Sequence, residues 1–501
     1  MTELESIKIK QRREKIISWF KNPYNLILIA ILIFAFFARL HYFVQTQEQA
    51  LWWDEGEYMS TAKHWASNVP YTLNPQRPPL FSFLAMFFFI MGLGELSIKF
   101  ALVLLPSTFL VFAVYLLGKE MFNKKIGLIA AFLTAISWTL LFWTSRFQPD
   151  FFSMSFQVLS VFFMWKYWKN PKSKFTIFAG FFAALGFYFK ISALLVPLII
   201  AIFILMKDRF AAFKNKDYYY FALAFLITLV PYFIWSYSTF ETLTAFKKGY
   251  SNAVGTPTPF GWYNLNFYYL LTGKFLFWIF LLGVFLALKF LLYLDLLFKD
   301  KRKIFDGGLF SILVFIIVSA FYIFYMRGTD DRWVFLWLPF IFILSGNALM
   351  FIHKNIKKYS KIIAIVVIIA LLAAVAYNQL SHNDQLTKLK KASFMPVRQA
   401  ALWMKENSEI GEKILSISYT QTVYYSERNV SSYSEIESAE EFDKYLADNK
   451  PRFLTVSVFE PHPQWIHSWL QENQDRFAVV QAYFADEART QPLLIVYELK
   501  Y

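Results

Sequence analysis

The sequence predicts a multi-spanning α-helical membrane protein, with about eleven transmembrane helices and a small extracytoplasmic α/β domain at its C-terminal end. Three observations support this fold class. Hydrophobic residues make up 57% of the 501 residues and charged residues only 17%, whereas a soluble chain carries about 25% charged residues. Apolar runs of about membrane length recur throughout residues 1–380. Residues 381–501 lack such runs, and short strand-like segments there alternate with amphipathic ones.

The composition also excludes several kinds of site and partner. The chain contains no cysteine, so disulfides, thiolate metal sites and a cysteine nucleophile are impossible. A formal net charge of +15 would favour a nucleic-acid partner in a soluble protein. Here the positive residues concentrate in loops on one side of the predicted spans. We therefore attribute the net positive charge to the orientation of the chain in the membrane. We therefore expect no nucleic-acid partner.

The apolar runs define the predicted spans, because a helix of about 20 apolar residues crosses a bilayer core. Eleven candidates can be identified: 25–45, 98–118, 127–144, 151–168, 175–189, 191–206, 218–238, 274–297, 307–325, 333–351 and 361–377. The fifth and sixth are short and almost continuous around Lys190, which predicts a tight helical hairpin. The apolar run 79–92 is too short to span comfortably, so we expect an interfacial or re-entrant helix there.

The loop charges predict the orientation of these spans. With a cytoplasmic N-terminus, the inner segments hold 25 Lys and Arg, against about ten in the outer loops before residue 378. The inner segments are 1–24, 119–126, 166–174, 207–216, 299–303 and 353–361. This distribution follows the positive-inside rule. We therefore expect an integral protein of the cell (plasma) membrane with its C-terminal segment outside. The first span follows a basic stretch without a small-residue cleavage site, so it is expected to stay as an anchor.

Residues 381–501 are expected to form the soluble domain. Their 13 Lys and Arg against 17 Asp and Glu give them a negative balance, unlike the rest of the chain. Strand-length runs at 414–418, 453–459, 478–484 and 493–496 are separated by amphipathic stretches at 396–407, 439–449 and 463–473. Alternation of strands and helices is typical of a small α/β domain.

Adjacent acids in the first outer loop, residues 46–97, are the first candidate site residues. Asp54 and Glu55 follow Trp52 and Trp53 and precede a helical stretch at 58–67. Acids at a helix N-terminus can simply cap the helix. Two of them beside aromatic residues at the membrane surface favour a functional role. Asp150, in the short turn between the third and fourth spans, is predicted on the same side; the alternative for it is ordinary turn chemistry.

Basic residues on the predicted outer side are few. The main ones are Arg77, Lys190, the pair Lys247 and Lys248, Arg327 and Arg332. An unpaired charge next to an apolar segment is costly, so these residues either pair with acids, such as Asp330 and Asp331 beside Arg332, or hold an anionic ligand. The Arg guanidinium suits a phosphate group. Carboxylates and cations on one side indicate a reaction with an anionic leaving group and an activated hydroxyl or amine.

Five short motifs together carry a resemblance to a known family. They are Trp53-Asp54-Glu55 with Tyr58, Gln76-Arg77-Pro78-Pro79-Leu80, Asp150 in its turn, Lys190 ahead of Ala193-Leu194-Leu195-Val196-Pro197, and the segment from Arg332 to Pro339. In their order along the chain, and in the side of the membrane on which they are predicted to lie, these motifs resemble the GT-C glycosyltransferases across residues 1–380. The nearest branches are the protein O-mannosyltransferases, whose donor is dolichyl phosphate mannose, and the lipid A aminoarabinose transferases.

The resemblance implies a function. Residues 1–380 would be a GT-C-like catalytic domain with juxtamembrane helices in loop 46–97. It would transfer a single sugar, with inversion, from a polyprenyl-phosphate donor to a protein, lipid or glycan acceptor at the outer face. Asp54 would be the general base, and Glu55 and Asp150 would orient the acceptor or sugar. Arg77, Lys190 and Arg332 would neutralise the lipid phosphate.

The resemblance leaves a divalent metal open. Gln76 stands where the aminoarabinose branch has a metal-binding acid, and the segment 239–262 contains no histidine. No zinc-binding His motif or Gly-rich phosphate loop is present. No cofactor is therefore assigned from the sequence.

Two other functions are compatible with a membrane chain of this kind. A transporter or flippase of lipid-linked or small solutes would place charges near mid-bilayer and contain inverted repeats, and neither is conspicuous in the sequence. An adhesion or structural protein would use residues 381–501 to bind a partner, but it would not need eleven spans.

Overall fold

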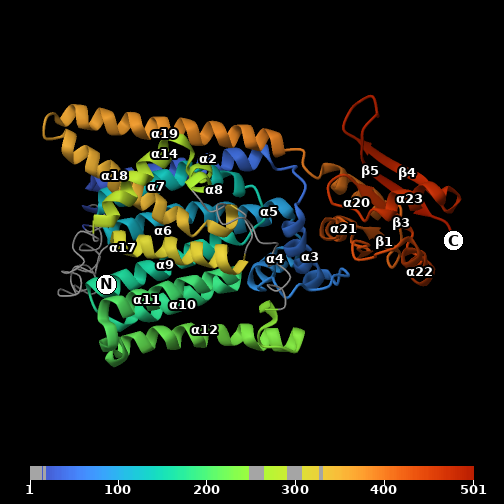
Figure 1. Ribbon diagram of the computed structural model, residues 1–501, viewed down its shortest axis with the longest axis horizontal. Coiled ribbons are helices and arrows are strands. Elements are labelled where there is room, and N and C mark those ends of the chain that lie inside the picture. The colour runs from blue at the N-terminus through green and yellow to red at the C-terminus, as the bar shows by residue number, and fades with distance from the viewer. Residues whose placement is uncertain (1–13, 15–17, 248–264, 290–306, 327–330) are drawn as a thin grey trace, which may run out of the picture.

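The computed structural model describes residues 14, 18–247, 265–289, 307–326 and 331–501, and every statement below concerns these residues. They form a bundle of long helices and a smaller domain containing a β-sheet, which lies at one end of the bundle (Figure 1). We call this end of the bundle the domain end. The predicted fold class, a multi-helical membrane protein with a small C-terminal α/β domain, is confirmed.

Eight helices in the described part of the chain are long and apolar enough to cross a membrane. They are α2 (Pro23–Gln45), the continuous α5, η1 and α6 (Glu95–Met121), η2, α11 and η3 (Ile191–Lys214), α12 (Lys216–Phe240), α14 (Leu265–Ala287), α17 with η6 (Gly307–Met326), α18 (Trp337–Ile356) and α19 (Lys361–Lys390). Each overlaps a span predicted from the sequence. Residues 290–297 of the eighth predicted span lie outside the described residues.

The three other predicted spans are helical too. α9 (Asp150–Lys169) and α10 (Ser173–Phe189) cover the fourth and fifth, and α7 (Lys124–Ile136) and α8 (Trp138–Trp143) divide the third at Ser137. α10 ends at Phe189, and after Lys190 the chain continues into η2 (Ile191–Leu194) and α11, both of which contact α10, as expected for the predicted hairpin.

Local sequence explains where several of these helices begin and how closely they pack. Asn22, Asn123, Asn215 and Ser360 each cap a helix start with a side-chain oxygen that accepts a backbone N–H. Gly180 allows α10 to contact α12, because a Cβ at this position would overlap the carbonyl oxygen of Phe221.

Two shorter helices lie at the domain end. α3 (Trp53–Ser67) follows α2, and α4 (Leu80–Ile90) packs against it (Figure 1). With 11 residues α4 is only about 17 Å long, which is too short to cross a bilayer core. The chain thus forms a short helix where the sequence predicted one that does not span.

The C-terminal domain contains a mixed five-stranded sheet with the order β2-β1-β3-β5-β4. β1 (Lys413–Ser416) pairs in parallel with β2 (Asn429–Ser431) and β3 (Phe453–Ser457), whereas β5 (Pro492–Leu499) is antiparallel to β3 and β4 (Phe477–Phe484). The helices are α20 (Met395–Glu406), α21 (Tyr419–Ser426), α22 (Ala439–Asn449) and α23 (Trp465–Glu472).

The domain has its own hydrophobic core, in which Leu415, Phe442, Leu454 and Trp469 are buried. α19 continues to Lys390, so the last bundle helix passes the predicted domain boundary at residue 381 and leads directly towards the sheet.

Candidate functional site

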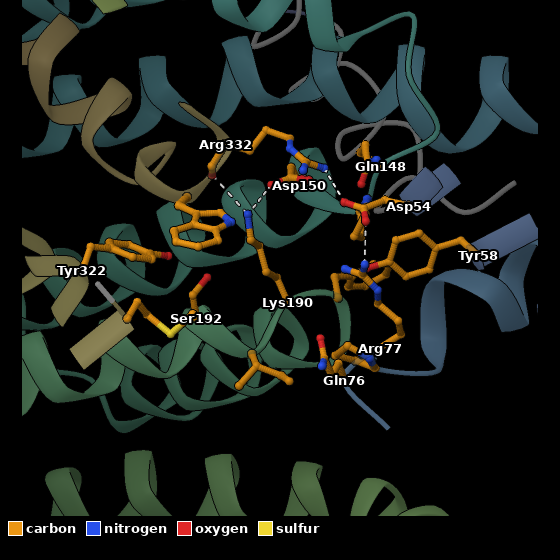
Figure 2. A pocket seen from close by; sticks show the side chains of 16 residues that line it. Asp54, Tyr58, Gln76, Arg77, Gln148, Asp150, Lys190, Ser192, Tyr322 and Arg332 are labelled. Atoms are coloured by element: carbon orange, nitrogen blue, oxygen red, sulfur yellow. Dashed lines mark hydrogen bonds and ion pairs between the residues drawn. The ribbon is translucent and has the colours of Figure 1, made fainter. Parts of the chain in front are cut away.

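The first turn of α3 separates the two adjacent acids that the sequence singled out. Consecutive residues on a helix point about 100° apart, so Asp54 and Glu55 cannot face the same way. Asp54 points into a cavity at the domain end (Figure 2). Glu55 is fully buried on another side of the turn, where its Oε2 accepts a hydrogen bond from the backbone N–H of Trp52 at 2.7 Å.

Two arginines from distant segments hold the Asp54 carboxylate. Arg77 Nη2 lies 2.6 Å from Asp54 Oδ1, and Arg332 Nη1 lies 2.9 Å from Asp54 Oδ2. Burial opposes ionisation of this carboxyl, but the charges and hydrogen bonds of Arg77 and Arg332 outweigh it and lower the pKa of Asp54 to about 2. Asp54 is therefore a carboxylate at neutral pH. The side chains of Asp330 and Asp331, the partners considered for Arg332, lie outside the described residues.

Glu57 is a further acid at this site that the sequence analysis did not single out. Its Oε2 lies 2.5 Å from Arg77 Nε, and Asn74 donates a hydrogen bond to its Oε1. Glu57 follows Asp54 by three residues, a spacing that places two side chains on the same face of a helix. That spacing was the available signal, because Arg77 can bridge two acids on one face.

Asp150 and Lys190 form a second ion pair in the same cavity. Asp150 is the first residue of α9 and Lys190 follows the last residue of α10, and Lys190 Nζ lies 2.5 Å from Asp150 Oδ1. Lys190 Nζ also donates to the backbone carbonyl of Arg332 at 3.1 Å. Lys190 thus connects α9 and α10 to η7 (Asp331–Val334), the turn that carries Arg332.

These groups surround one polar cavity of about 290 Å³. Figure 2 shows the side chains of Asp54, Arg77, Asp150, Lys190 and Arg332 converging on it. Five of the six site residues predicted from the sequence therefore lie together. Other lining residues are Tyr58, Gln76, Gln148, Ser192, Tyr322 and Trp333.

Glu55, the sixth predicted residue, does not line the cavity. Its Oε1 accepts a hydrogen bond from the backbone N–H of Phe147 at 2.5 Å. Arg146 Nη1 lies 3.4 Å from its Oε2, and Lys99 Nζ lies 3.8 Å from its Oε1. The Arg146 guanidinium also stacks on the Trp52 ring, 3.6 Å from the ring centre. Glu55 therefore joins α3 to the turn that precedes Asp150 rather than facing the cavity.

A second, mostly apolar cavity of about 190 Å³ adjoins the polar one, and both include Ile191 and Ser192 in their walls. Leu194, Leu195, Phe246 and Phe321 supply much of its apolar surface. Lys247, one of the outer cations noted in the sequence, lies in its wall as well. Lys248 and Arg327 lie outside the described residues.

The carboxylates of the polar cavity do not suit a metal ion, because Asp54 and Asp150 each face a cation rather than each other. The described part of the chain contains no group of three or more His, Asp or Glu side chains that could hold a metal. We therefore assign no catalytic step to a metal.

The comparisons with known proteins concern the family and the fold. Residues 76–235 match the family described as dolichyl-phosphate-mannose-protein mannosyltransferase. ArnT from Cupriavidus metallidurans, in the apo state, superposes with a TM-score of 0.66 at 12% identity, over 93% of this chain and 97% of that one. The Archaeoglobus fulgidus oligosaccharyltransferase in the apo form gives 0.62 at 14% identity, over 88% of this chain and 70% of that one. The chain has the GT-C fold.

A third structure, the arabinofuranosyltransferase AftD from Mycobacteria, shares this fold with a TM-score of 0.56 at 12% identity, over 94% of this chain and 40% of that one. No curated protein sequence matches the chain. The resemblance to GT-C glycosyltransferases is thus confirmed. The family match includes Arg77, Asp150 and Lys190, whereas Asp54 and Arg332 lie outside the matched residues.

Proposed function

We propose that the protein is an inverting glycosyltransferase, which moves one sugar from a polyprenyl-phosphate donor to a hydroxyl or amine at the outer face of the membrane. The observation that carries the proposal is the polar cavity, where two acids and three cations converge beside an apolar cavity. The matched mannosyltransferase family and the shared GT-C fold support the same reaction class.

The two adjoining cavities fit the two parts of such a donor. Arg77, Lys190 and Arg332 would neutralise the phosphate in the polar cavity. The start of the polyprenyl chain would follow the shared wall at Ile191 and Ser192 into the apolar cavity. Lipid phosphates without a sugar have been seen in proteins of the same fold: ArnT from Cupriavidus metallidurans was solved with undecaprenyl phosphate, and AglB from Archaeoglobus fulgidus with dolichol phosphate.

The reaction needs a base for the acceptor and a stabilised leaving group. The acceptor oxygen or nitrogen forms a bond to the anomeric carbon of the sugar while the bond from that carbon to the phosphate oxygen breaks. The acceptor proton passes to Asp54, and the phosphate leaves with the electron pair of the broken bond. Attack on the face opposite the phosphate inverts the anomeric centre. Arg77, Lys190 and Arg332 stabilise the negative charge that collects on the phosphate.

Without donor, each cation assigned to the phosphate is paired with an acid. Arg77 and Arg332 contact Asp54, and Lys190 contacts Asp150. A bound phosphate competes with these carboxylates for the same N–H donors. Donor binding then weakens the hold of the two arginines on Asp54 and raises the pKa of this carboxyl, which makes it a better base. The base would thus become effective when the leaving group is in place.

The position of the cavity favours transfer over transport. The transporter alternative predicts a site with charged groups near the middle of the bilayer. The acids and cations converge instead at the domain end, next to α3 and α4 (Figures 1 and 2). In our proposal the domain end faces the outside, the N-terminus is cytoplasmic, and the acceptor is a protein, a lipid or a glycan.

Purified protein in vesicles that contain a polyprenyl-phosphate sugar tests the proposal. A transferase releases polyprenyl phosphate as the sugar moves to an added acceptor, and the anomeric configuration of the product is opposite to that of the donor. Movement of intact donor between the leaflets, without release of polyprenyl phosphate, would establish the flippase alternative instead.

A further inference from the structure

The C-terminal domain contacts the helix that carries Asp54 through one short helix of its own. α21 packs against α3 (Figure 1). We propose that Thr420, at the start of α21, is a positioning residue that fixes the peptide unit preceding Asp54, so that the C-terminal domain sets the orientation of the catalytic carboxylate. This inference rests on the proposed function of Asp54.

The decisive contact is a single hydrogen bond to the main chain. The Thr420 hydroxyl donates to the carbonyl oxygen of Trp53 at 2.8 Å, and this carbonyl belongs to the peptide bond that joins Trp53 to Asp54. Thr420 is almost fully buried, so water does not replace the bond easily. A rotation of this peptide unit would turn Asp54 away from Arg77 and Arg332.

Further contacts between α3 and α21 limit how the two helices slide. The Ser60 hydroxyl donates to the carbonyl of Thr420 at 3.0 Å, about two turns further along α3 than Trp53. Lys63 Nζ lies 2.6 Å from Glu427 Oε1 and donates to the carbonyl of Tyr424 at 3.0 Å. Just before α3, the backbone N–H of Leu51 donates to the Tyr425 hydroxyl at 2.9 Å. The domain therefore contacts α3 at its start and along its length.

Gly56 makes this close approach feasible. A Cβ added at Gly56 would lie 2.9 Å from the backbone nitrogen of Gln421 and 2.9 Å from the carbonyl carbon of Thr420. Real Cβ atoms essentially never come so close to backbone atoms, so a larger residue would push α21 away from α3. The glycine lies two residues after Asp54, within the same turn.

The chain offers a matched control for Thr420. Thr422 lies on the same helix and is equally buried, but its hydroxyl donates only within the C-terminal domain, to the Ser418 carbonyl and the Ser416 hydroxyl. Valine has the shape of threonine without the hydroxyl. Thr420→Val and Thr422→Val therefore each remove one buried hydroxyl, and only the Thr420 hydroxyl contacts α3.

The test compares the two variants in sugar transfer and in donor binding. We expect Thr420→Val to lower kcat about 10-fold while the donor Kd stays within about 2-fold, since the phosphate-binding cations come from other segments. Thr422→Val is expected to leave kcat within about 2-fold of the unchanged protein. Equal kcat in both variants would overturn the proposal and leave Thr420 a purely structural role.

A second measurement does not depend on the enzymatic activity. Hydrogen exchange of the backbone amides at 54–57 should be faster in Thr420→Val than in Thr422→Val or the unchanged protein. Gly56→Ala should accelerate it as well, whereas Gly94→Ala, where nothing lies within 4 Å of the added Cβ, should not. Unchanged exchange in Thr420→Val and Gly56→Ala would overturn the positioning contact. Normal exchange effects with no sugar transfer by the unchanged protein would instead refute the proposed function.

Discussion

The Arg332 guanidinium donates a hydrogen bond to the Asp54 carboxylate at 2.9 Å, although 278 residues separate the two in the sequence. Arg77 holds the other carboxylate oxygen. The proposed base is therefore placed by groups from loop 46–97 and from the segment before α18. The donor phosphate would bind to the same two arginines, which couples leaving-group binding to the state of the base.

Replacing Asp54 tests its role as the base. Asp54→Asn keeps the size of the side chain but removes its proton affinity, so turnover should fall by about 10²–10⁴-fold with the protein still folded. Initial rates of sugar transfer by the purified variant measure this effect. Asp448→Asn, at an exposed position of the C-terminal domain, is a suitable control and should transfer sugar at the normal rate. Near-normal transfer by Asp54→Asn would rule out the assignment.

Replacing Arg332 tests phosphate binding. Arg332→Ala should raise the donor KM and lower kcat, because a cation near the leaving group is lost. Arg332→Lys should restore only part of the activity, since the ammonium lacks the planar fork that contacts a phosphate with two N–H groups. If Arg332→Ala leaves both donor KM and kcat unchanged, its contact with Asp54 is its whole role.

The pH profile tests the electrostatic coupling. The pKa of Asp54 is about 2 in the free protein because Arg77 and Arg332 outweigh burial, so protonation of Asp54 does not limit kcat/KM above about pH 4. Arg77→Gln removes one of the two cations beside Asp54. Burial and the nearby acids Glu57 and Asp150 favour the protonated form of Asp54, and one cation opposes them less strongly than two. The pKa of Asp54 must then rise, and the acid limb of kcat/KM should move to higher pH. Measurements between pH 4 and 8 test this, and an acid limb that does not move would contradict the coupling.

Replacing Glu55 tests whether it is structural. Among the described residues, Glu55 is the acid paired with Arg146, so Glu55→Gln removes the negative charge that accompanies this buried cation. Breaking a buried ion pair from one side costs about 3–5 kcal/mol, so the variant should unfold at a clearly lower temperature. Thermal unfolding in detergent measures the loss, and Glu48→Gln, at an exposed position, should not change it. A Glu55→Gln variant with normal stability but no sugar transfer would show that Glu55 has a catalytic role.

The sequence carried enough information for the helices and for most of the cavity. Apolar runs predict spans directly, and charged residues at the ends of spans are few, so Asp54, Arg77, Asp150, Lys190 and Arg332 stood out. The partners of these residues could not be predicted, because each ion pair joins segments that only the packing of the bundle brings together.

Two particular residues show the same limit. Glu55 is next to Asp54 in the sequence, and only the exact start of α3 decides that one faces the cavity and the other faces Arg146. Arg39, in α2, is fully buried, and it donates to the Ser107 hydroxyl at 2.8 Å and to the carbonyls of Thr134 and Ala135. The pattern of charged residues in the sequence does not predict such backbone partners.

The orientation in the membrane is the remaining prediction, and single cysteines can test it because the chain has none. Ser67 at the end of α3 and Ser434 in the C-terminal domain are exposed, and both should label with an impermeant maleimide from outside when replaced by cysteine. Tyr359, which is 91% exposed between α18 and α19, and Lys172, between α9 and α10, lie in predicted inner segments. Their cysteine variants should label only after permeabilisation, because the Lys and Arg bias places these turns in the cytoplasm. Labelling of Tyr359→Cys from outside, with protection of Ser67→Cys, would place the polar cavity at the cytoplasmic face and contradict transfer at the outer one.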